Sequence, residues 1–586
     1  MRRSALWAAY GDALGFITEF ADSRGVERRA GAPHVRRTVP WRRRVGGQFG
    51  AEVDLPAGAV SDDTQLRLAT CRCISPDGRF DVEAFSKIEL PVWPAYALGA
   101  GRGSRAAAAN LARRDTTWAS NFFSGRGTDY VQGGGNGAAM RVQPHIWAAG
   151  ERDLPDVLHD VLINALCTHG HPRGFLGAYF HACCLHLTIG EQRASEPADW
   201  RRIVMSFREA AELIRTDDTV RDLWIDPWER RYGQPIEGAI AEVAAEMLED
   251  VTRVEQIHPL DGLGAFRTAV EDLKLYEPEQ RGSGTKTALL AAAACLIFAA
   301  DVEQGTLACA NALGTDTDTV ATMAGALLGP LASGMPDGPV QDANYIDREA
   351  ERMWAIGAGR VAPNFPFVDL LSWAPPRTQS DVVGRQNGTL GLAGLGPAIE
   401  EGRSWATGGR EQADYGWLTL WFGQQVLAKR RHEPADLASE AVVEADPAYL
   451  AGSLVDAPPR QRRSQATPTP SRGLRAGGRR GDAIPRHKDQ DSRQVEMPLA
   501  SNERADDKPT SQSRGQWLKA VASARTMHEL TGIVIRSGFD QEVVGAGLMK
   551  SIDEVEDGIE GAVAYTAILA KARIARENRS EDKRRS

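Results

Sequence analysis

Two clusters of acidic and hydroxyl residues, far apart along the chain, have the composition of a metal site. The first is Ser61-Asp62-Asp63-Thr64 and the second is Asp316-Thr317-Asp318-Thr319. Carboxylates one or two positions apart point in different directions along a helix, so they can converge only from a loop or a helix start. A helical pattern follows each cluster, over 65–71 and 320–328, which predicts a helix N-terminus at both places.

Two facing acidic clusters would repel each other unless a cation lay between them. Carboxylate and hydroxyl oxygens are hard ligands that suit Mg²⁺, Mn²⁺ or Ca²⁺ better than zinc. Taken alone, either cluster is explained more simply as a helix N-cap, because Ser, Asp and Thr are good capping residues. The metal interpretation therefore depends on the two clusters being considered together and with the motifs described next.

Four more stretches combine glycines with polar residues. Gly11-Asp12-Ala13-Leu14-Gly15 precedes Glu19, and 133–141 reads GGGNGAAMR. Thr168 and His169 follow a predicted helix, and small residues follow the second acidic cluster over 324–329. The glycine-rich 282–287 lacks the spacing of a nucleotide-triphosphate loop, and the histidines at 169 and 171 lack further zinc ligands.

In this order, the motifs resemble the ADP-ribosylglycohydrolase family. The family pattern reads GDALG followed by a glutamate, then [ST]DDT, GNGAAMR, TH and GxDxDT, and this chain carries close matches to all five over 11–329. The resemblance covers the chain up to about residue 375. It implies an all-α bundle with a site for two Mg²⁺ ions, in which Mn²⁺ is a possible substitute.

The resemblance also assigns roles to individual residues. The implied metal ligands are Ser61, Asp62, Asp63, Asp316, Asp318 and Thr319. Glu19 matches the family's mobile glutamate. The loop at Gly135, Asn136 and Gly137 would hold the phosphates and distal ribose of ADP-ribose, and His169 would line the adenosine end.

The implied reaction is hydrolysis of the bond between the anomeric carbon of ADP-ribose and a side-chain nitrogen or oxygen, which reverses ADP-ribosylation. Cleavage of such a glycosidic bond passes through an oxocarbenium-like state. A carboxylate that takes a proton from water typically contributes about 10²–10⁴-fold. Asp62 and Asp63 are the first candidates for this catalytic base and Glu19 the third, and the sequence leaves the choice open.

The elements that must position these residues are predicted to be helices. Over 1–375 the chain is rich in Ala, Leu and Gly, with helical periodicity and almost no period-two alternation, so we expect an all-α catalytic domain. The expected helices cover 156–167, 176–189, 200–214, 236–251, 285–300 and 319–328.

Beyond this domain the composition changes three times. Residues 376–455 form an accessory segment that we expect to be partly helical, with Tyr415–Arg431 as a packed helix that ends in cations. Residues 456–515 have almost no apolar side chains and are predicted to be a disordered basic linker. Residues 516–580 return to helical patterning and predict a small module that is tethered rather than integrated.

Composition narrows the choice of partners. The chain has 586 residues with 42% hydrophobic side chains and a net charge of −9, which excludes wholesale disorder and gives no overall attraction to nucleic acid or anionic membranes. Seven cysteines without a CxxC pair are typical of a reduced, cytoplasmic protein. We expect an ADP-ribosylated protein or a small ADP-ribose conjugate as substrate, and a protein partner or self-association through 516–580.

Two alternatives to catalysis remain. The chain could be a non-catalytic ADP-ribose-binding protein, or a scaffold that acts through its C-terminal helical module. A non-catalytic ADP-ribose-binding protein would not need four carboxylates to bind phosphates. This argues against that alternative, because the chain keeps Asp62, Asp63, Asp316 and Asp318. A basic group at Arg36, Arg37 and 42–44 is either a solvated loop or a surface that steers an anionic substrate.

Overall fold

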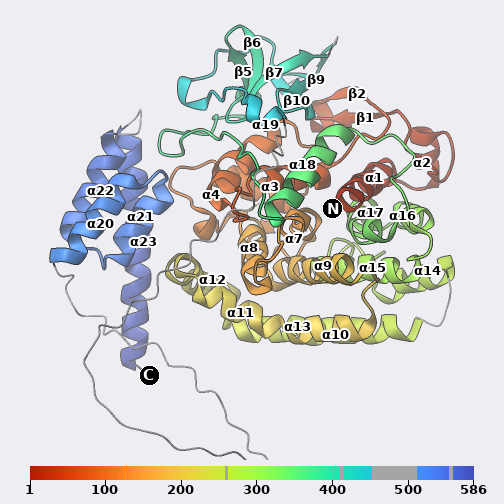
Figure 1. The fold of residues 1–586 in the computed structure, drawn as a ribbon, viewed down its shortest axis with the longest axis horizontal. Coiled ribbons are helices and arrows are strands. Elements are labelled where there is room, and N and C mark those ends of the chain that lie inside the picture. Colours follow the sequence, from red (N-terminus) through yellow and green to blue (C-terminus); the bar gives the residue numbers. More distant parts are fainter. Residues whose placement is uncertain are drawn as a thin grey trace, which may run out of the picture.

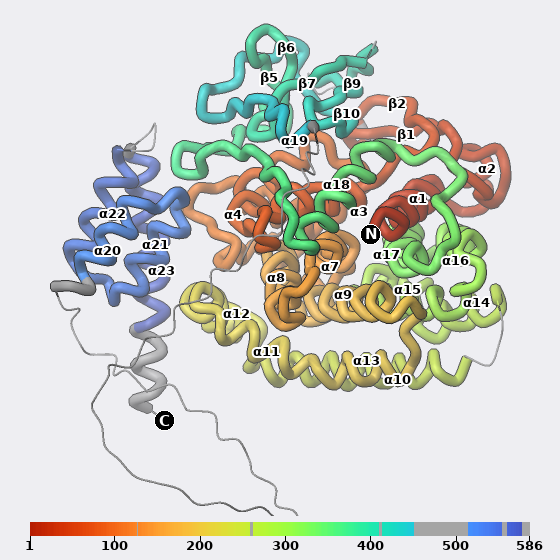
Figure 2. Tube along the Cα trace, in the orientation of Figure 1, coloured from red at the N-terminus to blue at the C-terminus, as the bar shows by residue number. Residues whose placement is uncertain are grey.

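The computed structural model describes residues 1–125, 127–257, 262–402, 404–408, 413–451, 511–553 and 558–585. They form a large helical body, a small β-sheet unit above it in Figure 1, and a separate group of helices at the C-terminal end. Figure 2 follows the chain through the body, into the sheet unit and then to the C-terminal helices. The predicted helical class of the catalytic domain is confirmed.

Most of the body consists of helices joined by short loops. The central ones are α1 (Arg2–Thr18), α3 (Asp62–Arg72), α8 (Leu154–Leu166), α9 (Pro172–Glu191), α15 (Gly284–Ile297), α16 (Val302–Ala310), α17 (Thr317–Leu328) and α18 (Ala343–Gly357). The outer ones are α2 (Ser23–Ala30), α6 (Arg102–Leu111), α10 (Pro197–Met205), α11 (Phe207–Thr216), α12 (Ile225–Tyr232), α13 (Ile236–Ile257) and α14 (Gly262–Asp272). Short helices lie at α4 (Val82–Ala84), α5 (Leu90–Val92) and α7 (Gln143–Trp147). The one helix expected over 200–214 is divided into α10 and α11 near Ser206.

The first helix packs directly against α17, backbone to backbone. A Cβ at Gly11 or Gly15 of α1 would overlap the backbone of Ala321 or Thr317 in α17. The same holds in reverse for Gly325, which lies against the carbonyl of Trp7. Since only glycine allows this approach, small residues spaced four apart on both helices bring the end of α1 to the start of α17.

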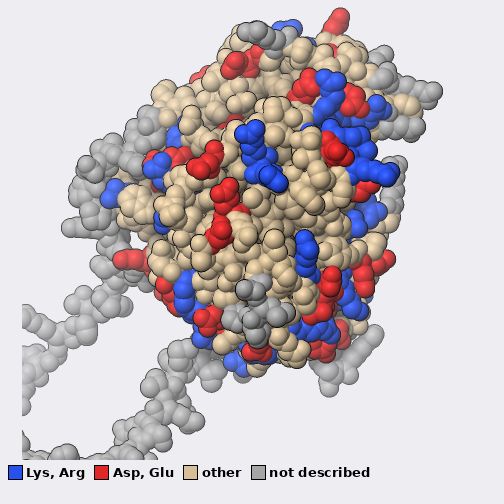
Figure 3. All heavy atoms as spheres, turned by 90° about the vertical axis from the view of Figure 1, so that its right-hand side faces the viewer, with Lys and Arg blue, Asp and Glu red and all other residues tan. Residues whose placement is uncertain are grey.

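Two antiparallel hairpins interrupt the helical body, and the shorter one pairs β3 (Ser124–Gly125) with β4 (Thr128–Asp129). β1 (Trp41–Val45) pairs with β2 (Ala51–Leu55), and Arg42 and Arg44 pair across to Asp54 and Glu52 at 2.8 Å each. The arginines of the basic group are therefore partly neutralised within their own hairpin. On the face that Figure 3 shows, which is the right-hand side of Figure 1, Lys and Arg gather toward one edge with Asp and Glu among them.

The segment after the body is a sheet, not a helix. Its strand order is β10-β9-β7-β6-β5, all antiparallel, with β8 beside β9. The strands are β5 (Val383–Gln386), β6 (Thr389–Leu392), β7 (Gly396–Glu401), β8 (Ala406–Thr407), β9 (Ala413–Leu420) and β10 (Gln425–Arg431). We refer to 383–431 as the β-unit; α19 (Pro447–Ala451) follows it.

The prediction of a helix over Tyr415–Arg431 was wrong. This stretch forms the hairpin of β9 and β10, which turns at Gly423 with φ +95°. A left-handed glycine between two runs of aromatic and apolar residues is a hairpin signal that the helical interpretation overlooked. The cations at its end lie on a strand.

A buried polar network joins the β-unit to the body. Arg72 on α3 donates to Glu89 at 2.6 and 2.8 Å, to Tyr345 at 3.0 Å and to the side-chain oxygen of Gln424 at 2.8 Å. The Arg72 and Glu89 side chains are fully buried. A buried, fully paired charge of this kind fixes one orientation of the two parts.

Four helices form the C-terminal module: α20 (Ser511–Ser523), α21 (Met527–Arg536), α22 (Gln541–Asp553) and α23 (Gly558–Arg585). They contact the body, contrary to the expected loose tether. His528 lies 3.3 Å from the hydroxyl of Thr219, Lys571 donates to the Asp115 carbonyl at 3.0 Å, and Arg576 lies 3.5 Å from Asp222. The linker predicted over 456–515 lies almost entirely outside the described residues.

Among the residues that the structure describes, no helix combines the length and apolarity that a bilayer crossing requires. All seven cysteines are buried and unpaired, as their spacing predicts.

Candidate active site

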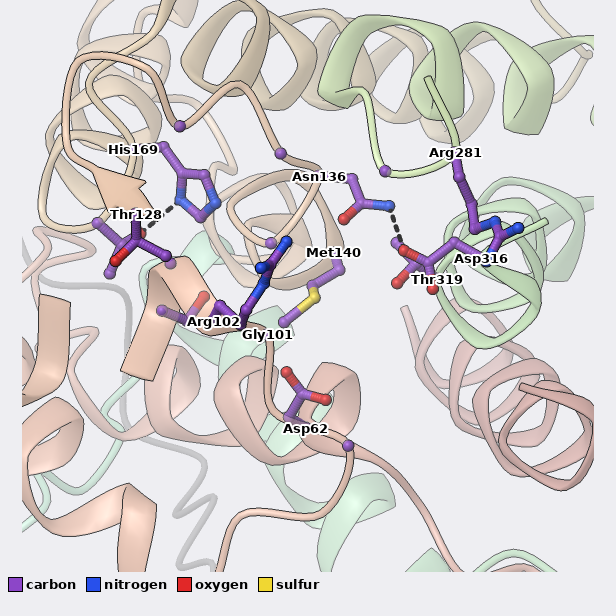
Figure 4. A pocket seen from close by; sticks show the side chains of 18 of the residues that line it. Asp62, Gly101, Arg102, Thr128, Asn136, Met140, His169, Arg281, Asp316 and Thr319 are labelled. Atoms are coloured by element: carbon purple, nitrogen blue, oxygen red, sulfur yellow. Dashed lines mark hydrogen bonds between the residues drawn. The ribbon is translucent and has the colours of Figure 1, made fainter. Parts of the chain in front are cut away.

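One cavity of about 460 Å³ collects residues from both acidic clusters, the glycine loop and the TH histidine. Figure 4 shows Asp316 and Thr319 on one side, His169 and Thr128 on the other, and Asp62 below them. Among the predicted site residues, those that line the cavity are Glu19, Asp62, Asp63, Gly135, Asn136, Gly137, His169, Asp316, Asp318 and Thr319. Ser61 does not line it.

The first acidic cluster is held at the start of α3, as predicted. Ser61 is the N-cap, and its hydroxyl accepts from the backbone N–H of Asp63 at 3.2 Å and donates to the Asp63 carboxylate at 2.9 Å. Asp12 on α1 accepts from the backbone N–H groups of Ser61 and Thr64, both at 3.0 Å. This carboxylate therefore fixes the entry of α3, so that Asp62 and Asp63 reach the cavity.

The second cluster is held at the start of α17. Asp316 is the N-cap residue, and its carboxylate accepts from the side-chain amide of Asn136 at 2.9 Å. Asp318 is 2% exposed and accepts from the backbone N–H of Thr319 at 2.9 Å. The bond from Asn136 ties the glycine loop to the acidic end of the cavity.

Glu19 caps the C-terminal end of α1, and its carboxylate is 4% exposed. One carboxylate oxygen each from Glu19, Asp316 and Asp318 lies within 4.8 Å of the others. Arg43 from β1 donates to Glu19 at 3.2 Å, and its guanidinium lies 4.4 Å from the ring centre of Phe16. The α1–α17 packing thus brings together carboxylates that are almost 300 positions apart in sequence.

Burial and mutual repulsion destabilise these carboxylates as anions. Burial, opposed by Arg43 and reinforced by Asp316, raises the pKa of Glu19 to about 7. Burial, and then the neighbouring carboxylates, raise the pKa of Asp62, Asp63 and Asp318 well above the usual range. One oxygen of Asp63 is buried without a hydrogen-bond partner among the described residues. An all-oxygen donor set with excess negative charge and an unpartnered carboxylate oxygen fits a divalent cation.

The histidine at the other end of the cavity is neutral. His169 is buried, and burial followed by the charge of Arg141 lowers its pKa to about 3, so the imidazole is uncharged. Its Nδ1 lies 2.7 Å from the hydroxyl of Thr168, which accepts from Arg141 at 2.9 Å. A Cβ on Gly137 would lie 3.1 Å from His169 and from Ser104, so glycine keeps this part of the cavity open.

Sequence reasoning missed several residues of the site. Arg43 was treated as one of a basic group, yet it alone of that group turns inward to Glu19. Its place on a five-residue strand with a buried–exposed pattern was the available signal. Phe20 follows Glu19 with φ +51° and is 67% exposed, and Arg281 lies 5.9 Å from its ring at the edge of the cavity.

Comparison with known proteins agrees with this geometry. Residues 3–358 match the family described as ADP-ribosylglycohydrolase. The chain belongs to this family. The matched region contains every residue that lines the cavity and ends with α18, so the β-unit and the C-terminal module lie outside the family's common part.

Curated relatives carry the name ADP-ribosylhydrolase ARH3. The Bos taurus protein is 30% identical over 212 residues, covering 35% of this chain and 51% of the relative. The Danio rerio protein is 24% identical over 326 residues, covering 49% and 78%. The chain thus spans about half the length of the bovine relative. A solved chain titled ADP-ribosylglycohydrolase-related protein complex aligns with a TM-score of 0.37 at 20% identity, covering 61% of this chain and 98% of that one.

Proposed function

We propose that this protein is a Mg²⁺-dependent hydrolase that releases ADP-ribose from a modified acceptor, a protein side chain. The observation that carries the proposal is the convergence of five carboxylates, the glycine loop and a neutral histidine on one cavity of about 460 Å³. A cavity of this size is within the range that holds a nucleotide-sized ligand. Membership of the glycohydrolase family supports the same reaction class.

The two ends of the cavity suit the two ends of ADP-ribose. The uncharged imidazole of His169 suits an adenosine, and the backbone of Gly135 and Gly137 allows close approach of the phosphates. The acidic end then receives the ribose whose anomeric carbon carries the acceptor. This orientation places the bond to be cleaved beside Asp62, Asp63 and Asp316.

The residues that would hold the divalent cations are Asp62, Asp63, Asp316, Asp318 and Thr319, with Ser61 orienting Asp63 from behind. Two Mg²⁺ ions, or Mn²⁺ in their place, would supply positive charge and Lewis-acid polarisation at the reacting sugar.

The chain itself supplies the proton acceptor. Asp62 and Asp63 line the cavity as buried carboxylates and are the first candidates for this role, and Glu19 is a third candidate. Arg43 restrains Glu19 by the bond at 3.2 Å. The N-cap residue Ser61 fixes Asp63 by accepting from its backbone N–H. The bond from the Asp62 N–H to the Leu98 carbonyl at 2.7 Å fixes the backbone of Asp62.

A substrate panel tests this proposal. The purified protein would be incubated with arginine-linked, serine-linked and O-linked ADP-ribosyl peptides and with ADP-ribosylated nucleic acid, and free ADP-ribose would be measured. We expect release from at least one modified peptide. ADP-ribose binding without release from any substrate would instead indicate a non-catalytic reader.

A further inference from the structure

A second cavity, of about 290 Å³, lies where the hairpin β1–β2, the segment Pro94–Ala100 and the β-unit meet. We refer to it as the junction cavity. The β-unit contributes Tyr415, Leu427 and Lys429 to its wall. These residues lie beyond 3–358, so the part of the chain that matches the family cannot build this cavity alone.

The wall of the junction cavity is cationic. Arg43, Arg44, Arg105 and Lys429 line it, and none of the described residues that line it is Asp or Glu. Arg43 and Arg44 pair with Glu19 and Glu52, at 3.2 and 2.8 Å, whereas Arg105 forms no ion pair with a described residue. Guanidinium and ammonium groups facing one hollow attract an anion, and low-dielectric walls strengthen the attraction.

The junction cavity borders the candidate active site. Gly99 lines both cavities, and with φ +89° it leaves room for Asp62, whose carboxylate oxygen would lie 2.9 Å from a Cβ there. Arg43 lines the junction cavity and also donates to Glu19. One short segment of chain, 98–100, therefore separates the cationic hollow from the acidic end where the acceptor would leave.

The orientation proposed for ADP-ribose indicates which part of the substrate reaches the junction cavity. The adenosine end of ADP-ribose lies toward His169, so whatever extends past the acidic end belongs to the acceptor. Arginine forks match phosphate oxygens in two-point contacts, and about 290 Å³ exceeds the volume of a single phosphate. We propose that the junction cavity binds a phosphate group carried by the acceptor, so that phosphate-bearing acceptors are the preferred substrates. This inference rests on the proposed function.

Direct binding provides the first test. Inorganic pyrophosphate would be titrated by calorimetry into protein saturated with ADP-ribose, at constant free Mg²⁺, so that the main cavity is filled. We expect a binding event in the wild type that weakens at least about tenfold in the double variant R105A/K429A, since the variant removes two cationic hydrogen-bond donors from the cavity wall. Arg385→Ala, which removes an exposed cation of β5 outside the cavity, is the matched control and should bind as the wild type does.

Kinetics provide the second test and distinguish an acceptor phosphate from a free phosphorylated metabolite. Two ADP-ribosyl peptides would be compared that differ only by a phosphoserine beside the modified residue. We expect the wild type to show a lower KM for the phosphopeptide, and R105A/K429A to lose that preference while its kcat on the plain peptide is unchanged.

Three results would separately contradict the anion site, the acceptor assignment and the proposed function. Equal pyrophosphate affinity in wild type and double variant, or no binding to the saturated wild type, would overturn the junction cavity as an anion site. Pyrophosphate binding with equal KM for both peptides would overturn the acceptor assignment and indicate a free metabolite. No hydrolysis of either peptide, with pyrophosphate binding that the double variant loses, would refute the proposed function and leave the anion site standing.

Discussion

Burying the carboxylates of the cavity together lowers the stability of the metal-free protein, and a bound cation would remove this loss. Asp318 is 2% exposed, and its pKa is raised by burial and then by Glu19 and Asp63. Without a cation these groups repel one another, and with one they become ligands. Stability and metal binding at this site are therefore coupled.

Asp318→Asn tests that coupling. Removing one negative charge relieves repulsion in metal-free protein, so its melting temperature should equal or exceed that of the wild type. The stabilisation by Mg²⁺, about 2.7 kcal/mol at a hundredfold excess over the dissociation constant, should be lost. Differential scanning fluorimetry with and without Mg²⁺ measures both effects. Glu303→Gln, on an exposed position of α16, is the control, and an unchanged Mg²⁺ shift in Asp318→Asn would contradict the assignment.

Gly137→Val tests the glycine loop. A Cβ there already lies 3.1 Å from His169 and Ser104, and the two additional methyl groups would fill the space between the loop and the histidine. We expect the dissociation constant for ADP-ribose to rise at least about tenfold in calorimetry. Gly264→Val, at an open position of α14, should leave it unchanged. Equal affinity for all three proteins would show that the loop does not contact the ligand.

For individual residues, the sequence predicts which side chains can bind metal better than it predicts which side chains they contact. Asp62, Asp63, Asp316 and Asp318 were found from their type and spacing because metal ligation demands such residues. Arg43 and Asp12 were not assigned roles, since an arginine beside other arginines and an aspartate inside a helix have ordinary explanations. Their roles depend on which side chain lies opposite, and that is a property of the tertiary structure.

At the scale of elements, the contact between α1 and α17 positions Glu19 against Asp316 and Asp318. The predicted small-residue helix proved to be one half of this contact, with Gly325 against the backbone of Trp7 and Gly11 against that of Ala321. The hairpin of β9 and β10 shows the opposite outcome. Its aromatic residues and terminal cations fit a helix end, and only Gly423 in a left-handed turn indicated the strands.

Gly325→Val should push α1 away from α17. A side chain cannot occupy the space against the Trp7 carbonyl, so we expect a loss of unfolding free energy of about 1–3 kcal/mol or more. Urea denaturation followed by circular dichroism measures this loss. The control is again Gly264→Val, whose only cost is that of valine within a helix. Similar midpoints for the two variants would refute backbone contact as the basis of the packing.

At the scale of the whole molecule, the active cavity belongs to the body alone. None of the described residues that line it comes from the β-unit or from the C-terminal module, whose contacts with the body include Thr219, Asp115 and Asp222. The domain boundaries proposed at 375, 455 and 515 remain predictions. The β-unit is tied to the body through the buried bond from Arg72 to Gln424, so it is expected to be needed for folding.

A chain that ends at Leu454 should therefore keep its turnover on a small ADP-ribosylated peptide. We expect kcat within about twofold of the full-length value, and loss of self-association or of affinity for a protein partner, because a linked module contributes effective concentration. Turnover assays and light scattering on both chains measure these properties. An inactive but folded truncated chain would show that the module acts on the site.

The central claim is that α1, α3 and α17 together build a divalent-cation site for ADP-ribose hydrolysis. The most direct measurement is the rate of ADP-ribose release from the best peptide of the panel, with metal-free protein titrated with Mg²⁺, beside Asp62→Ala and Asp316→Ala. We expect no release without the cation, saturable activation by Mg²⁺ in the wild type, and a loss of at least about a hundredfold in each variant with unchanged circular dichroism. Full turnover in excess chelator, or by either variant, would contradict it.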